Sequence, residues 1–154
     1  MELILYVAIL TIILVPLVNF SGVVVQMQAK SSVEQEVWGT GRMIAERIKY
    51  EIRNASGINT VTTTSISLGN SNAMLNPTVI DLAVGQVRIK QGVGAITALS
   101  GSMVTISNLV FTSYTSIDNK TKNIGFSFTV GETGTRSEYT ASQNINGDAE
   151  VRSN

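Results

Sequence analysis

The pattern of hydrophobic and polar positions divides the chain into three parts, and the first is almost purely apolar. Residues 3–25 contain no Lys, Arg, Asp or Glu, and their only polar side chains are those of Tyr6, Thr11, Asn19 and Ser21. As a helix that rises ~1.5 Å per residue, this run would extend over roughly 35 Å, enough to cross a hydrocarbon layer ~30 Å thick. Residues 1–25 are therefore predicted to form a hydrophobic helix that lies in a membrane or in an equally apolar environment.

Beyond Val25 the apolar positions narrow to a stripe at intervals of three or four residues, which is typical of an amphipathic helix. On the opposite face, Arg42 with Glu46 and Arg47 with Glu51 have the i,i+4 spacing of ion pairs. Gly57 follows the last periodic position and is predicted to cap the helix. Residues 26–57 are thus expected to continue the helix to about residue 55. The stripe consists of Val33, Val37, Gly41, Ile44, Ile48 and Ile52.

Three residues give the apolar run individual features. Glu2 is the only charged side chain at its head, and a carboxylate in apolar surroundings needs a cation, an aqueous interface or a proton. The N-terminal amine of a neighbouring copy, carried by Met1, is one such cation. Pro16 has no N–H and crowds the carbonyl four residues earlier, while Gly22 adds backbone freedom, so the helix is predicted to soften near residues 15–22. Plainer readings stay open: Glu2 can lie at an interface beside the helix dipole, and Pro16 can be a tolerated kink.

After Asn59 the composition shifts to Thr, Ser, Val, Ile and Gly, and residues 58–154 are predicted to form a globular antiparallel β-domain. A bulge or turn at Asn108 would bring Val104, Ile106, Leu109 and Phe111 to one face. The apolar face of the sheet is expected to pack on Ile44, Ile48 and Ile52, which makes the fold class α+β. The polar tail from residue 142 to residue 154 is expected to fray. The predicted strands cover residues 65–68, 78–83, 86–90, 95–99, 103–107, 109–115, 123–130 and 138–145.

The composition of the chain argues against several classes of function. The 154 residues include 11 basic and 11 acidic side chains, so net charge gives no case for binding nucleic acid. The chain has neither Cys nor His, which removes disulfides, thiolate metal sites and the usual general base. The carboxylates of the β-domain are scattered, and no Gly-rich phosphate loop leads from a strand into a helix. The sequence therefore predicts no enzyme, no catalytic residues, no cofactor and no metal.

The run ELILYVAIL, followed by a continuous amphipathic helix and a small β-domain, resembles the mature form of type IV pilins and pseudopilins. The stretch SSVEQEVWGTGRMIAERIKYEIRNASGI is similar in particular to the prepilins close to the J-type pseudopilins. The resemblance covers residues 1 to about 58. The chain lacks the leader of the family, its Gly and the Phe-Thr start, and Met1 stands directly before Glu2. We expect either that a short basic leader precedes the chain in its precursor or that this family member is processed differently.

The resemblance implies the pilin fold and two successive localisations. These are the bacterial inner membrane before assembly and an extracellular filament at the cell surface after it. It implies a prepilin peptidase, N-methylation, the pilus assembly machinery and many copies of the chain as partners. Glu2 would pair with a neighbour's N-terminus, and the zone from Pro16 to Gly22 would lose helical hydrogen bonds in the filament. The expected function is that of a major pilin serving adhesion or motility. The alternatives are a minor pilin or J-like pseudopilin, and a single-pass membrane-anchored binding domain that does not polymerise.

Overall fold

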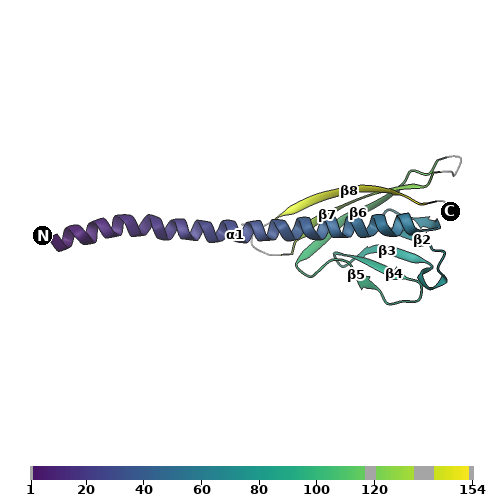
Figure 1. Ribbon diagram of the computed structural model, residues 1–154, viewed down its shortest axis with the longest axis horizontal. Coiled ribbons are helices and arrows are strands. Elements are labelled where there is room, and N and C mark those ends of the chain that lie inside the picture. Colours follow the sequence, from purple (N-terminus) through teal and green to yellow (C-terminus); the bar gives the residue numbers. More distant parts are fainter. Residues whose placement is uncertain (1, 117–120, 134–140, 153–154) are drawn as a thin grey trace.

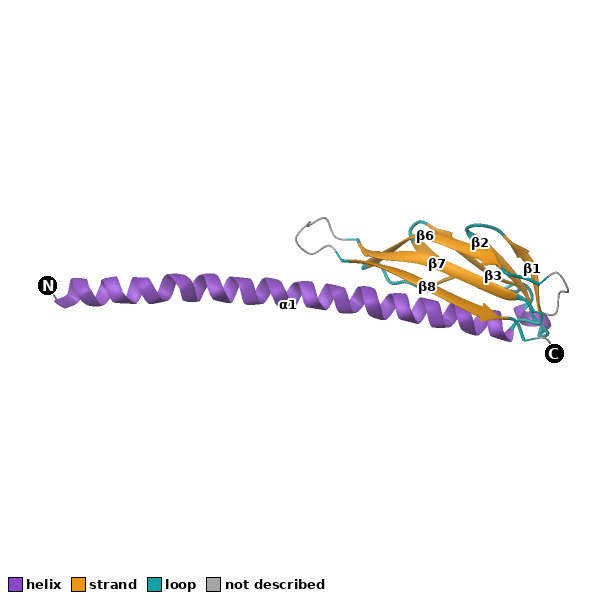
Figure 2. Ribbon diagram, turned by 90° about the horizontal axis from the view of Figure 1, so that it is seen from above, coloured by secondary structure: helices purple, strands orange, loops and turns teal. Residues whose placement is uncertain are grey.

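The computed structural model describes residues 2–116, 121–133 and 141–152 of the chain. It consists of one long helix, α1 (Glu2–Asn54), and a β-domain that packs on the C-terminal part of this helix (Figure 1). The helix has 53 residues, which at ~1.5 Å per residue corresponds to about 80 Å. Figure 2 shows that its N-terminal part projects well beyond the β-domain. The predicted α+β class, with a long helix packed against antiparallel β-structure, is confirmed.

The described strands form two antiparallel sheets instead of the one that the sequence suggested. The larger sheet has the order β1-β2-β3-β4-β5 and the smaller one the order β6-β7-β8. A short 3₁₀ helix, η1 (Ala73–Leu75), precedes β3. The strands are β1 (Gly57–Val61), β2 (Ser65–Gly69), β3 (Thr78–Ala83), β4 (Gln86–Gln91), β5 (Thr97–Ala98), β6 (Val104–Ser113), β7 (Asn123–Glu132) and β8 (Ser142–Glu150).

Strand β6 joins the two sheets and contains the predicted bulge. Its pairing with β7 shifts between Ser107 and Val110, and Asn108 has a φ of 53°. The prediction that Val104, Ile106, Leu109 and Phe111 share a buried face is confirmed. At the other edge of β6, the N–H of Ile106 donates to the carbonyl of Gly85 and the N–H of Phe111 donates to that of Thr63, over 2.7 Å and 2.9 Å. These bonds connect β6 to the loops of the larger sheet.

The predicted stripe of α1 forms the centre of the core. Ile44, Ile48 and Ile52 are fully buried, and the helix contacts β6, β7 and β8. Gly41 lies where α1 comes closest to the smaller sheet, because a Cβ at this position would be 2.5 Å from Ile145 Cδ1. The absence of a side chain at residue 41 therefore sets how closely the helix approaches β8.

The end of α1 differs from the prediction. The N–H of Ala55 donates to the carbonyl of Ile52 over 3.3 Å, and the N–H of Ser56 donates to that of Gly69 over 2.9 Å. Gly57 does not have the positive φ of a glycine cap and is instead the first residue of β1. The cap prediction was wrong because the chain enters the larger sheet directly after the last helical turn.

Ion pairs also differ in part from the prediction. The expected pair Arg47–Glu51 is present, with 2.7 Å between Arg47 Nη2 and Glu51 Oε1. Glu46 pairs with Lys49 over 3.1 Å instead of with Arg42. In the larger sheet, Arg88 Nε and Nη2 donate to both Asp81 oxygens. Hydrogen bonding to the Asp81 carboxylate raises the pKa of the Arg88 guanidinium, because it favours the charged form of this side chain.

Candidate assembly and membrane-insertion surface

The N-terminal part of α1 is a bare apolar rod. The first fully buried helical residue is Val37, and the large apolar side chains between Leu3 and Met27, apart from the half-buried Val24, have exposed fractions from 46% to 76%. An 18-residue window of this helix has a mean hydropathy of 2.6 and none of it is buried, so by length and composition it could cross a membrane. Exposed apolar surface on this scale marks a contact with lipid or with other chains. We call residues 2–25 the rod.

Two hydroxyl side chains of the rod, those of Thr11 and Ser21, form hydrogen bonds with the helix itself. Thr11 Oγ1 donates to the carbonyl of Val7 or Ala8, over 3.0 Å and 2.9 Å, and Ser21 Oγ donates to the carbonyl of Val18 over 2.8 Å. Because each hydroxyl uses a carbonyl of its own helix, neither needs water as an acceptor. Both residues are therefore compatible with a fully apolar environment.

Glu2 lies in the first turn of α1 and is exposed. Its carboxylate is favoured there by the partial positive charge of the helix N-terminus. None of the three ion pairs found in the described part of the chain includes Glu2. Met1 lies outside the described residues, so the predicted contact between Glu2 and a neighbour's N-terminus stays a prediction.

Helix α1 is continuous through Pro16 and Gly22 in the single chain, and the softening predicted near residues 15–22 stays a prediction. The continuity has a simple reason. Proline removes the one hydrogen bond that would reach the carbonyl of Ile12, while its neighbours keep theirs. A Cβ on Gly22 would meet no atom within 4 Å, so no packing within the chain explains a glycine there. The loss of helical geometry in an assembled filament stays a prediction.

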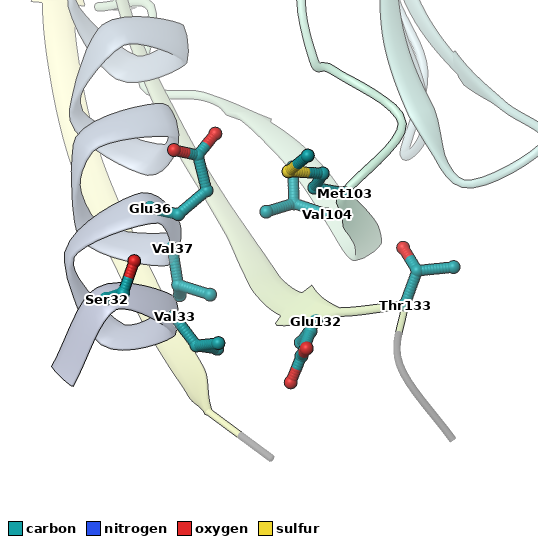
Figure 3. A pocket seen from close by; sticks show the side chains of 8 residues that line it. All are labelled: Ser32, Val33, Glu36, Val37, Met103, Val104, Glu132 and Thr133. Atoms are coloured by element: carbon teal, nitrogen blue, oxygen red, sulfur yellow. The ribbon is translucent and has the colours of Figure 1, made fainter. Parts of the chain in front are cut away.

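A hollow at the base of the β-domain was not anticipated from the sequence. It has a volume of about 410 Å³ and lies between the middle of α1 and the strands β6 and β7. Figure 3 shows Val33 and Val37 on one side of it and Met103 and Val104 on the other. The two valines belong to the predicted stripe, but only the fold brings them opposite residues near position 104. The remaining lining residues are Ser32, Glu36, Glu132 and Thr133.

Comparisons with models of protein families, with curated proteins and with solved structures found no match to this chain. Within residues 2–116, 121–133 and 141–152, no three acidic side chains lie close enough together to hold a metal ion. The geometry of the rod and of the β-domain therefore carries the functional argument.

Proposed function

We propose that this chain is a structural subunit of an extracellular helical filament of the type IV pilus kind, and that it polymerises through its N-terminal helix. One observation carries the proposal: a rod of about 35 Å without a charged residue between Leu3 and Val25 extends from a folded domain that does not cover it. Such a surface needs lipid before assembly and other rods after it. An axial bundle of rods would bury the apolar side chains and would leave the β-domains outside as a solvent-exposed layer.

Glu2 supplies the second element of the proposal. A carboxylate enclosed by apolar rods requires a cation, and the N-terminal amine of a neighbouring copy lies at the same end of the molecule. Opposite charges ~4 Å apart attract by about 4 kcal/mol at an effective dielectric constant of 20, against about 1 kcal/mol in water. The contact would therefore hold neighbouring copies in register mainly where the rods exclude solvent.

The test replaces Glu2 by Ala in cells that produce the chain and compares sheared surface filaments by electron microscopy. We expect filaments to be lost while the amount of protein in the membrane is kept. The matched control is Glu46→Ala, which removes the same charge from the exposed face of the helix and should leave filaments unchanged.

Two outcomes would contradict the proposal. If neither wild type nor variant forms filaments and both display the β-domain at the membrane, the chain is a plain membrane anchor. If filaments form but this chain is only a trace component of them, it is a minor pilin or pseudopilin and not the main subunit.

A further inference from the structure

The hollow at the base of the β-domain has the chemistry of a site for a long basic side chain. Four of its lining residues are apolar, and the two charged ones, Glu36 and Glu132, are both acidic. Arginine and lysine place an aliphatic stem on apolar surface and a cationic head on carboxylates. A neutral apolar ligand would leave the two carboxylates without a partner, and an anion would be repelled by them.

Both carboxylates of the hollow have unused capacity for hydrogen bonds. Glu36 accepts only a 3.3 Å bond from Thr40 Oγ1, and Glu132 Oε2 is buried without a hydrogen-bond partner among the described residues. Neither residue belongs to an ion pair in this part of the chain. A buried carboxylate oxygen without a donor is costly, so an incoming cation would be favoured at this place.

The wall of the hollow is held in place. Thr133 Oγ1 lies 3.0 Å from Thr105 Oγ1, and the N–H of Thr133 donates to the carbonyl of Met103 over 3.2 Å. On the other side, Val37 is buried in the core. The hollow is therefore preformed, and an occupant would lose little affinity to rearrangement of the protein.

The opposite end of the β-domain carries two arginines, which line a hollow of about 480 Å³ together with Asp148 and Glu150 and also line a smaller hollow beside it. Arg53, in the last turn of α1, and Arg152, just after β8, line this smaller hollow of about 220 Å³ and are its only charged residues. Both side chains are exposed, and neither belongs to an ion pair among the described residues. The backbone next to Arg152 is anchored, because the N–H of Val151 donates to the carbonyl of Lys122 over 2.9 Å.

From these two ends we infer a contact between copies: the Arg53 and Arg152 end of one molecule docks on the Glu36 and Glu132 hollow of the next. The contact joins different surfaces, so it does not close on itself and repeats along an open helix. Arg53 follows Glu36 by 17 residues in α1, which corresponds to an axial offset of about 26 Å between docked copies. The rod, at about 35 Å, is longer than this offset and would lie beside the helix of the copy below. The inference rests on the proposed filament and assigns the contact that its β-domains make.

The test is a charge exchange in cells that produce the chain, with sheared filament yield as the readout. The base variant is Glu36→Arg with Glu132→Arg, and the end variant is Arg53→Glu with Arg152→Glu. We expect each to reduce the yield about tenfold or more, since each places like charges across the contact. The four substitutions together should return the yield to within about threefold of wild type, because the charges are again complementary. Circular dichroism of each purified variant checks that the β-domain remains folded.

The matched controls change the same charges outside the two hollows. Glu34→Arg and Arg42→Glu alter exposed residues of the same helix and should leave the yield unchanged. An unchanged yield in the base variant would overturn the inference, as would folded variants whose combination restores nothing. The latter result would indicate another occupant of the hollow. Absence of filaments in wild type would instead reject the proposed function, so the two failures are distinguishable.

Discussion

Val84 is a β-branched residue in a backbone conformation that such residues rarely adopt. Its φ is 51° and that of Gly85 is 69°, and the two residues connect Ala83 to Gln86, which pair directly in the β3–β4 hairpin. Positive φ at both central positions is the pattern of a type I′ turn, which favours Asn-Gly. The Val84 side chain is 98% exposed, so no packing offsets the cost of its backbone conformation.

We therefore predict that Val84→Asn stabilises the protein. Asn tolerates the left-handed region far better than Val, and the gain should be about 1 kcal/mol in the free energy of unfolding. Thermal unfolding of the full chain in detergent, followed by circular dichroism, measures it. Val93→Asn is the matched control, because Val93 is equally exposed but does not have a positive φ. Equal effects of the two substitutions would show that lower surface hydrophobicity, and not relief of strain, is the cause.

Glu51 shows where a prediction based on single residues fails. Its spacing from Arg47 correctly predicted an ion pair, but the helical pattern placed the pair on the solvent side. Glu51 is in fact 5% exposed, and both its carboxylate oxygens lie 3.3 Å from Gln91 Nε2 in β4. A charged residue next to the stripe can be buried when a distant strand supplies a donor, and nothing in the local sequence identifies that strand.

At the scale of elements, the hydrophobic periodicity correctly predicted those helices and strands whose apolar residues recur regularly. The helix and strand β7, with its strict alternation of apolar residues, were predicted nearly as they are, and so was the bulge at Asn108. Strand β8 was in large part mistaken for a fraying tail, because only Ile145 and Ala149 among its inward residues are apolar. Nine consecutive residue pairs with β7 hold it instead. Strand β1 was missed since its polar sequence carries no alternation, and residues 138–140 of the predicted last strand lie outside the described residues.

Two glycines of α1, two residues apart, have opposite environments. A Cβ on Gly41 would lie 2.5 Å from Ile145 Cδ1 and 3.1 Å from Val130 Cγ2, whereas a Cβ on Gly39 would meet nothing within 4 Å. Gly41 therefore permits the helix to approach β7 and β8, and Gly39 faces away from the β-domain. Both glycines lower the stability of the helix by the same amount, because each adds backbone freedom to the unfolded chain. Only at Gly41 does close packing against the smaller sheet offset this loss.

We predict that Gly41→Val lowers the free energy of unfolding by about 2 kcal/mol, because the added carbons overpack the contact with β8. Gly39→Val, which has the same effect on helix propensity without the contact, should be neutral or slightly stabilising. Urea denaturation of both variants, followed by the fluorescence of Trp38, compares them. Similar losses from both would mean that backbone flexibility of the helix, and not close packing, is what the glycines provide.

At the scale of the whole molecule, the chain consists of a folded domain that buries its own core and a rod that buries nothing. The rod was predictable because a run without charged residues from Leu3 to Val25 indicates an apolar environment. The hollow at the base was not, because Val33 and Val37 meet Met103 and Val104 only through the fold. In the proposed filament the rod would change its surroundings on assembly, while the β-domain would keep its internal contacts.

In the proposed filament, packing many rods into one axial bundle would constrain their direction, whereas the wider β-domains would have to spread around the bundle. A rigid helix of 53 residues would fix the direction of each β-domain to that of its rod. We therefore predict that α1 loses helical hydrogen bonds within residues 14–24 when filaments form, because a local break lets the two directions differ. Pro16 already lacks the bond to the carbonyl of Ile12, and Gly22 is the residue that resists a local opening least. Electron microscopic reconstruction of wild-type filaments should show an interrupted helix in this zone, although the helix of the single chain is continuous.

Substitutions at Pro16 and Gly22 separate the contributions of these two residues to the predicted break. Pro16→Ala restores an N–H and removes a cost of about 3 kcal/mol to helix continuity, so it should reduce filament yield or straighten the helix. Gly22→Ala stabilises the helical conformation by about 1 kcal/mol, so it should reduce filament yield or straighten the helix less than Pro16→Ala does. Leu17→Ala is the control, since it changes apolar surface without restoring a hydrogen bond. A straight, fully hydrogen-bonded helix in wild-type filaments would show that the β-domains reach their positions without any bend in the rod.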